Sequence, residues 1–264
     1  MASVSAVAHR AVARIGSRPK VATAVHEFHP DEIRPESHPA YGPWRYVAPL
    51  PSPELMGTVG APDVENFLVV GDAWSQVIGR FLPPPAEPGP LVLDVGCGCG
   101  RIARFLLAVP GLRYVGFDIM RPSIEWCRRH LEPLAEGRFA FHHVDAFSRH
   151  YNPGGRLAPG DLRFPCEEGS VDLAFGASLF THLLEPDARH YLAETSRVLR
   201  AGGRALYSVL TSPEPGRRFS GAEDRIDVEL DYFVAMAEAA GLELEERLGE
   251  LAGQETVLLR VPSS

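Results

Sequence analysis

The chain has 264 residues, of which 45% are hydrophobic, so it is long enough to bury one full core and to carry an extension. A formal net charge of −8 argues against a nucleic acid as the main partner, and no apolar stretch is long enough to cross a membrane. The four cysteines have no spacing typical of a metal site, so we expect reduced thiols in a cytoplasmic protein.

Residues 1–62 are expected to form an N-terminal extension. Residues 1–26 carry basic residues and no acidic one, which resembles a transit peptide, although a simple tail is the favoured interpretation. Prolines then recur as far as Pro62 and disfavour regular helices or strands. Because aromatic residues lie among these prolines, we expect this part to pack on the domain. Tyr41 and Trp44 would there contact the substrate as a lid, or pack behind the sheet.

The catalytic domain is expected to span residues 63–264 and to begin with a helix. Apolar residues recur at helical spacing over residues 64–82, and Asp63 is of a type that caps helix N-termini. The proline-rich residues 83–90 then interrupt the chain before the first strand.

The next stretch combines a strand, a glycine turn and a helix. Residues 91–95 are a short apolar run typical of a buried strand. Three glycines alternate with two cysteines over residues 96–100, and helical spacing follows over residues 102–107. In α/β sheets this arrangement builds a nucleotide site at a helix N-terminus, where glycines let a ligand lie against the backbone.

Two further expected strands end on an aspartate. In the first strand, residues 91–95, Asp94 is the next-to-last residue. The two further strands are residues 113–118, which end on Asp118, and residues 138–145, which end on Asp145. Because ligands bind at the carboxyl ends of the strands in open α/β sheets, we expect the three carboxylates to lie along one crevice.

The rest of the chain continues to alternate between helix and strand. Residues 146–169 form a long irregular loop that contains Tyr151 and Asn152, two candidate substrate-binding residues, and such loops are usually functional or mobile. Helices are expected over residues 122–131, 178–183, 186–199 (stopped by Gly202-Gly203) and 230–240, and strands over residues 171–176, 204–210, 242–251 and 255–261.

The glycine turn alone leaves two interpretations open. Gly98-x-Gly100-x-x-Ala103 fits the dinucleotide fingerprint, and Asp118 follows at a suitable distance for a ribose-binding carboxylate. Residues 92–100 (VLDVGCGCG) instead resemble the first motif of class I S-adenosylmethionine (SAM)-dependent methyltransferases, and residues 191–203 resemble a segment of many small-molecule members. The closing pair of strands and the lack of a second domain favour the methyltransferase.

This resemblance covers about residues 63–261 and implies an α/β fold. The expected architecture is a Rossmann-like, seven-stranded, mostly parallel sheet with an antiparallel C-terminal hairpin and helices on both faces. In the family, the acid after the second strand binds the ribose hydroxyls and the acid after the third lies by the adenine amino group. The residues expected to bind SAM, or its product S-adenosylhomocysteine, are Asp94, Gly96, Cys97, Gly98, Gly100, Asp118, Ile119, Asp145, Ala146, Phe147 and Ala177.

A hydroxyl acceptor must lose a proton when it is methylated, and a histidine with a pKa near neutrality is a natural base. His182 follows the fourth strand at the expected edge of the crevice, and several small-molecule O-methyltransferases resemble this layout. The competing roles for His182 are packing beneath the cofactor and capping the helix that follows. No metal site is expected, because the fourth strand ends without an acid and His26-x-x-His29 lacks the HExxH pattern.

We therefore predict a SAM-dependent methyltransferase that acts on a small molecule, with a hydroxyl of a sugar or natural product as the favoured acceptor. The alternatives are N- or S-methylation of a small metabolite, an NAD(P)-binding oxidoreductase, or a protein that keeps the fold for binding alone. No nucleic-acid or membrane partner is expected. The identity of the acceptor and the oligomeric state are left open.

Overall fold

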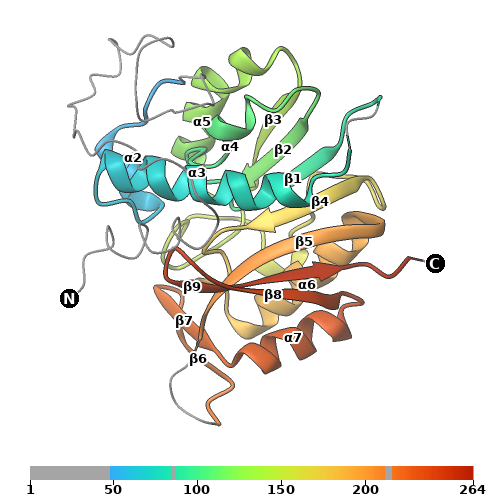
Figure 1. Cartoon of the computed structure of the whole chain (residues 1–264). Coiled ribbons are helices and arrows are strands. Elements are labelled where there is room, and N and C mark those ends of the chain that lie inside the picture. Colours follow the sequence, from blue (N-terminus) through green and yellow to red (C-terminus); the bar gives the residue numbers. More distant parts are fainter. Residues whose placement is uncertain (1–47, 85–86, 212–215, 264) are drawn as a thin grey trace.

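The structure, a computed structural model, describes residues 48–84, 87–211 and 216–263 (Figure 1). The basic tail, Tyr41 and Trp44 lie outside the described residues, so the lid over the active site stays a prediction. No helix in the described part of the chain is both long and apolar enough to span a bilayer.

Within the described residues, nine strands form one twisted sheet, and β1, β2, β3, β4 and β5 run parallel to one another in it. The order is β3-β2-β1-β4-β5-β7-β6, while β9 pairs antiparallel with β5 and with β8. The strands are β1 (Leu91–Val95), β2 (Arg113–Asp118), β3 (Phe139–His143), β4 (Val171–Gly176), β5 (Leu199–Thr211), β6 (Phe219–Ala222), β7 (Arg225–Val228), β8 (Glu243–Leu251) and β9 (Gln254–Arg260).

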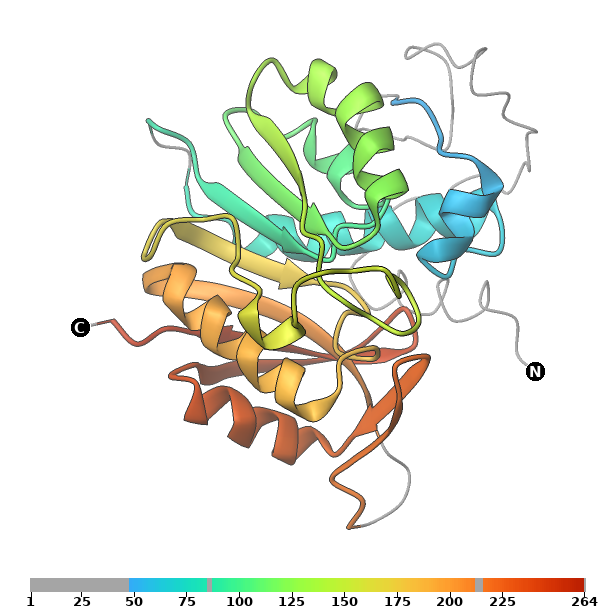
Figure 2. The ribbon, with the colours of Figure 1, turned by 180° about the vertical axis from the view of Figure 1, so that it is seen from behind.

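Helices cover both faces of this sheet, as the two opposite views in Figures 1 and 2 show. Neighbouring residues of a strand point to opposite faces, so Val92 packs in the core beneath α3, α4 and α5 while Leu93 packs in the core beneath α6 and α7. The helices are α2 (Pro53–Thr58), α3 (Val64–Phe81), α4 (Ala103–Leu106), α5 (Arg121–His130), α6 (Glu185–Val198) and α7 (Leu230–Ala239), with two short 3-10 helices at Glu132–Ala135 and Pro159–Asp161.

The expected fold class is confirmed. The described residues form nine strands where seven were expected, and the difference is an additional hairpin. The strands β6 and β7 form an antiparallel pair that joins the sheet where Thr211 of β5 meets Val228 of β7. This β6–β7 hairpin was not predicted, because its two strands have only four residues each and show no clear alternation. Its turn, Glu223-Asp224, reaches the cavity described below.

One local prediction is wrong, and two others differ in detail. Residues 178–183 form turns rather than a helix, because Ser178 adopts a left-handed φ of 61° and α6 begins only at Glu185. That helix ends at Val198, before Gly202-Gly203, because Leu199 is already extended and pairs with Val171 of β4. The helix after the glycine turn, α4, has only four residues, so its dipole adds little to an anion site.

Residues 48–62 pack on the domain, whereas the boundary expected at Asp63 stays a prediction. Ala48 and Leu50 are buried. The buried Arg104 of α4 donates hydrogen bonds to the carbonyl oxygens of Ala48 and Pro49. The segment that contains α2 therefore belongs to the same packed unit as α3 and α4.

The predicted cap of α3 is confirmed, because the Asp63 carboxylate accepts a hydrogen bond from Asn66 N at 2.7 Å. We expect Asp63→Ala to lower the free energy of unfolding by about 1 kcal/mol, the usual value of such a cap. Urea denaturation measures this change. Glu229→Ala is the matched control, because Glu229 precedes α7 but makes no side-chain cap. Equal effects of the two substitutions would contradict the role of Asp63.

Candidate active site

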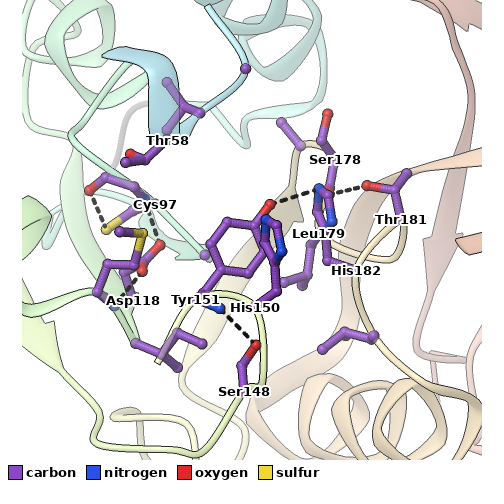
Figure 3. A pocket seen from close by; sticks show the side chains of 18 of the residues that line it. Thr58, Cys97, Asp118, Ser148, His150, Tyr151, Ser178, Leu179, Thr181 and His182 are labelled. Carbon is purple, nitrogen blue, oxygen red and sulfur yellow. Dashed lines mark hydrogen bonds between the residues drawn. The ribbon is translucent and has the colours of Figure 1, made fainter. Parts of the chain in front are cut away.

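A cavity of about 780 Å³ opens at the carboxyl ends of β1, β2 and β4 (Figure 3). The glycine turn and the residues that follow β2 line one part of it. The loops that follow β3 and β4, together with the turn of the β6–β7 hairpin, line another part. Residues of α2 and α3, of the end of β5 and of the turn between β8 and β9 also line the cavity. This is the place where ligands bind in open α/β sheets.

The glycine turn is left-handed at Gly96, Gly98 and Gly100, with φ values of 77°, 52° and 75°. A Cβ atom on Gly98 would lie 2.4 Å from Cγ1 of Val59, so the segment after α2 makes the close approach to this glycine. A Cβ atom on Gly100 would lie 2.3 Å from Cδ1 of Leu131, and Gly100 does not line the cavity. Glycine at position 100 therefore serves the packing of the turn.

Asp118 ends β2 and ties the glycine turn to this strand. Its Oδ2 accepts a hydrogen bond from Gly98 N at 2.8 Å, and its Oδ1 accepts one from Met120 N at 2.7 Å. Burial raises the pKa of this carboxyl group, and the two backbone donors oppose the rise. Each oxygen keeps a further lone pair, and the residue lines the cavity, so Asp118 can accept hydrogen bonds from a vicinal diol.

Asp94 lies one residue before the end of β1 and is only 2% exposed. The Tyr114 hydroxyl donates to its Oδ2 at 2.7 Å. Burial raises the pKa of Asp94 to about 8, so the group is mostly protonated at neutral pH. Asp94 lines the cavity as a neutral hydrogen-bonding group.

Asp145 is the predicted cofactor carboxylate that the structure does not bring to the cavity. It lies two residues beyond β3 and accepts hydrogen bonds from Arg156 Nε at 2.8 Å and Asn152 Nδ2 at 3.3 Å. Hydrogen bonds from these two side chains lower its pKa. Asn152 does not line the cavity either, whereas Tyr151 does, as do the other predicted cofactor residues Cys97, Ile119, Ala146, Phe147 and Ala177.

His182 lies in the cavity wall on the loop between β4 and α6. Its Nδ1 is 2.8 Å from the carbonyl oxygen of Glu223, which can only accept a hydrogen bond, so Nδ1 carries the proton. In the neutral ring Nε2 therefore presents a lone pair, and the Tyr151 hydroxyl donates to it at 3.1 Å (Figure 3). Burial lowers the pKa of His182, so the ring is neutral at physiological pH.

Sequence reasoning missed two buried polar side chains in the cavity wall. Asn66 is 3% exposed, and neither its amide oxygen nor its amide nitrogen has a hydrogen-bond partner among the described residues. Arg101 is 9% exposed, and its guanidinium makes no hydrogen bond to a described residue; burial lowers its pKa to about 10. A signal was present at Asn66, because it interrupts the apolar stripe of α3 four residues before Val70.

Comparison with known proteins agrees with this geometry. A family model described as "methyltransferase domain" matches residues 92–203. An O-methyltransferase of Penicillium expansum is 28% identical over 57% of this chain and 48% of its own length. The 27-O-demethylrifamycin SV methyltransferase of Amycolatopsis mediterranei is 28% identical over 61% of this chain and 57% of its own. The chain thus spans about half the length of these curated relatives.

A similar solved structure is that of a TehB-like SAM-dependent methyltransferase of Corynebacterium glutamicum. It has a TM-score of 0.50 and 20% identity, and the match covers 79% of this chain and 92% of the other. At this level of identity the likeness concerns the fold.

Proposed function

Residues 92–203 of this chain form a class I SAM-dependent methyltransferase domain, and on that premise we propose that the protein transfers the methyl group of SAM to a hydroxyl group of a small molecule. The proposal extends to a sugar or natural product as the acceptor.

The residues of the cavity fit the cofactor. Asp118 can accept hydrogen bonds from the two ribose hydroxyls, and Gly96 and Gly98 of the glycine turn line the same cavity. Arg101 supplies a cation in the cavity wall, and the Asn66 amide supplies a donor without a hydrogen-bond partner among the described residues, which together suit the carboxylate of the amino-acid end. When bound, SAM supplies a methyl group on a cationic sulfur.

The roles of Asn66 and Arg101 predict a selective loss of affinity. In Asn66→Leu and Arg101→Leu, calorimetric titration should show binding of S-adenosylhomocysteine weakened by roughly tenfold or more, the value of a hydrogen bond to a charged group. Binding of 5′-methylthioadenosine, which lacks the amino-acid carboxylate, should change little and serves as the internal control. An equal loss for both ligands would contradict this assignment.

The observation that supports a hydroxyl acceptor is the protonation state of His182. The Glu223 carbonyl fixes the proton on Nδ1, and burial keeps the ring neutral, so Nε2 can take up a proton inside the cavity. A hydroxyl nucleophile requires such a group, because its proton is not lost spontaneously at neutral pH.

The cavity wall also supports a polar, hydroxylated acceptor. Asp187 and Asp224 contribute carboxylates that can accept hydrogen bonds from several hydroxyls, and Leu183 and Leu210 contribute apolar surface beside them. Methyl transfer to oxygen is also what the names of the two relatives above describe for those proteins.

The proposal is tested by titration followed by turnover. We expect SAM and S-adenosylhomocysteine to bind and NADH not to bind. With SAM labelled in its methyl group, transfer to members of a panel of sugars, phenols and macrolide-type alcohols should exceed transfer to matched amines and thiols. Binding of NADH in place of SAM would favour the oxidoreductase, and SAM binding without transfer to any acceptor would favour a binding protein.

A further inference from the structure

The lone pair of the proposed base is already occupied. Nε2 of His182 accepts a hydrogen bond from the Tyr151 hydroxyl, and the two rings meet edge to face with centroids 5.1 Å apart. An acceptor hydroxyl therefore reaches Nε2 only if Tyr151 leaves or if Tyr151 passes the proton on.

Glu223 fixes the positions of both His182 and the loop that carries Tyr151. The backbone carbonyl of Glu223 accepts the hydrogen bond from His182 Nδ1, while the carboxylate of Glu223 accepts from Ser148 Oγ at 2.6 Å and from His150 N at 3.1 Å. Ser148 Oγ in turn accepts from Tyr151 N at 3.1 Å. Tyr151 and His182 are thus fixed to the same turn of the β6–β7 hairpin.

The loop that carries Tyr151 is also closed on itself. Ser148 and Asn152 exchange two backbone hydrogen bonds, and the Asn152 amide donates to the carbonyl oxygen of Ala146 at 2.9 Å. Moving this loop away would break several of these contacts at once, and the ring of Tyr151 is itself packed edge to face between the rings of His150 and His182. The structure favours a tyrosine that stays in place during the reaction.

We propose that Tyr151 is a catalytic proton relay between the acceptor hydroxyl and His182. This inference rests on the proposed transfer to oxygen. An oxygen lone pair of the acceptor forms the new bond to the methyl carbon, and the sulfur–methyl bond breaks with its electron pair going to sulfur. The acceptor proton moves to the Tyr151 oxygen as the Tyr151 proton moves to Nε2. The positive charge passes from the sulfonium to the imidazolium, and Tyr151 ends unchanged.

The environment of Tyr151 suits a relay. The Tyr151 side chain lies among those that line the cavity, so the acceptor can donate to its hydroxyl (Figure 3). Burial raises the pKa of Tyr151 to about 12, so the phenol keeps the proton that it must donate. The two transfers then occur together, and no free phenolate is needed.

Tyr151→Phe tests the relay, because it removes the hydroxyl and leaves the ring. We expect single-turnover methyl transfer to fall by roughly a hundredfold or more, with unchanged affinity for SAM. Rates in mixtures of light and heavy water should indicate two protons in flight for the wild type and one for the variant. Tyr232→Phe is the matched control, because that hydroxyl binds Glu185 at 2.7 Å and lies outside the cavity wall.

The outcomes separate this inference from the proposed function. If the wild type methylates hydroxyls and Tyr151→Phe is as fast or faster, the tyrosine only blocks the base and the relay is wrong. If the wild type methylates no hydroxyl, the proposed function itself fails. The ¹⁵N shift of His182 Nε2, read by NMR, should change in Tyr151→Phe without any substrate, and an unchanged shift would contradict the hydrogen bond on which the relay depends.

Discussion

Replacing His182 with alanine is expected to slow methyl transfer by roughly two to four orders of magnitude, the usual contribution of a general base. The affinity for SAM should change little, because the proposed role lies on the acceptor side. The measurement is single-turnover transfer at saturating SAM. His130→Ala is the control, because His130 stacks on Trp126 and is absent from the cavity wall. A role in packing would instead lower stability and weaken cofactor binding.

The pH dependence of the methyl-transfer rate tests the role of His182 independently. Only the neutral ring accepts a proton, so the rate should rise with pH and level off above the pKa of His182. Burial lowers that pKa below 6.5, as does the charge of His150, whereas the carbonyl of Glu223 and the charge of Asp224 oppose the shift. Tyr151, Asp187 and the Glu223 carboxylate are the other titratable groups on this side of the cavity. The midpoint should therefore lie below 6.5 in the wild type and disappear in His182→Ala.

Asp118→Ala is expected to weaken the binding of both S-adenosylhomocysteine and 5′-methylthioadenosine, by roughly tenfold or more. Both ligands carry the ribose, and the substitution also frees the backbone N–H groups of Gly98 and Met120 from their shared acceptor. This pattern differs from that expected for Asn66→Leu, which spares the shorter ligand. Calorimetric titration measures both affinities.

Asp231→Ala serves as the control for Asp118→Ala, because the Asp231 side chain is 75% exposed and pairs with Arg247 away from the cavity. Thermal unfolding without ligand checks that each variant is folded. Unchanged affinity in a folded Asp118→Ala protein would contradict the placement of the ribose.

The parts of the site that follow from local sequence were predictable. Residues 91–95, 113–118 and 171–176 match β1, β2 and β4 residue for residue, because short apolar runs between glycines and prolines define buried strands. The position of Asp118 and His182 at the edge of the sheet follows from those boundaries.

The rest depends on contacts between distant residues. Ser178 takes its left-handed conformation where its N–H donates to Ser208 Oγ and its Oγ accepts from Gln254 Nε2, and these partners lie 30 and 76 residues away. The bond from Ser148 to Glu223 joins residues 75 apart. Local periodicity carries no information about such pairs.

The position of Asp145 also depends on a contact that local sequence does not predict. Sequence position placed it beside Asp94 and Asp118, but Arg156 supplies a cation 2.8 Å from its Oδ2, away from the cavity wall. A strand-end carboxylate turns toward whichever donor the following loop provides, and that loop has no periodic pattern to predict its course.

The central claim, methyl transfer from SAM to an oxygen atom with His182 as the base, is tested most directly by locating the transferred carbon. The enzyme is incubated with SAM that carries a ¹³C-labelled methyl group and with the best acceptor of the panel, and the product is examined by NMR. We predict one labelled methyl group bonded to oxygen, formed by the wild type and lost in parallel with the rate in His182→Ala. A labelled methyl group on nitrogen or sulfur, or an oxygen-methylated product formed equally fast by His182→Ala, would contradict the account.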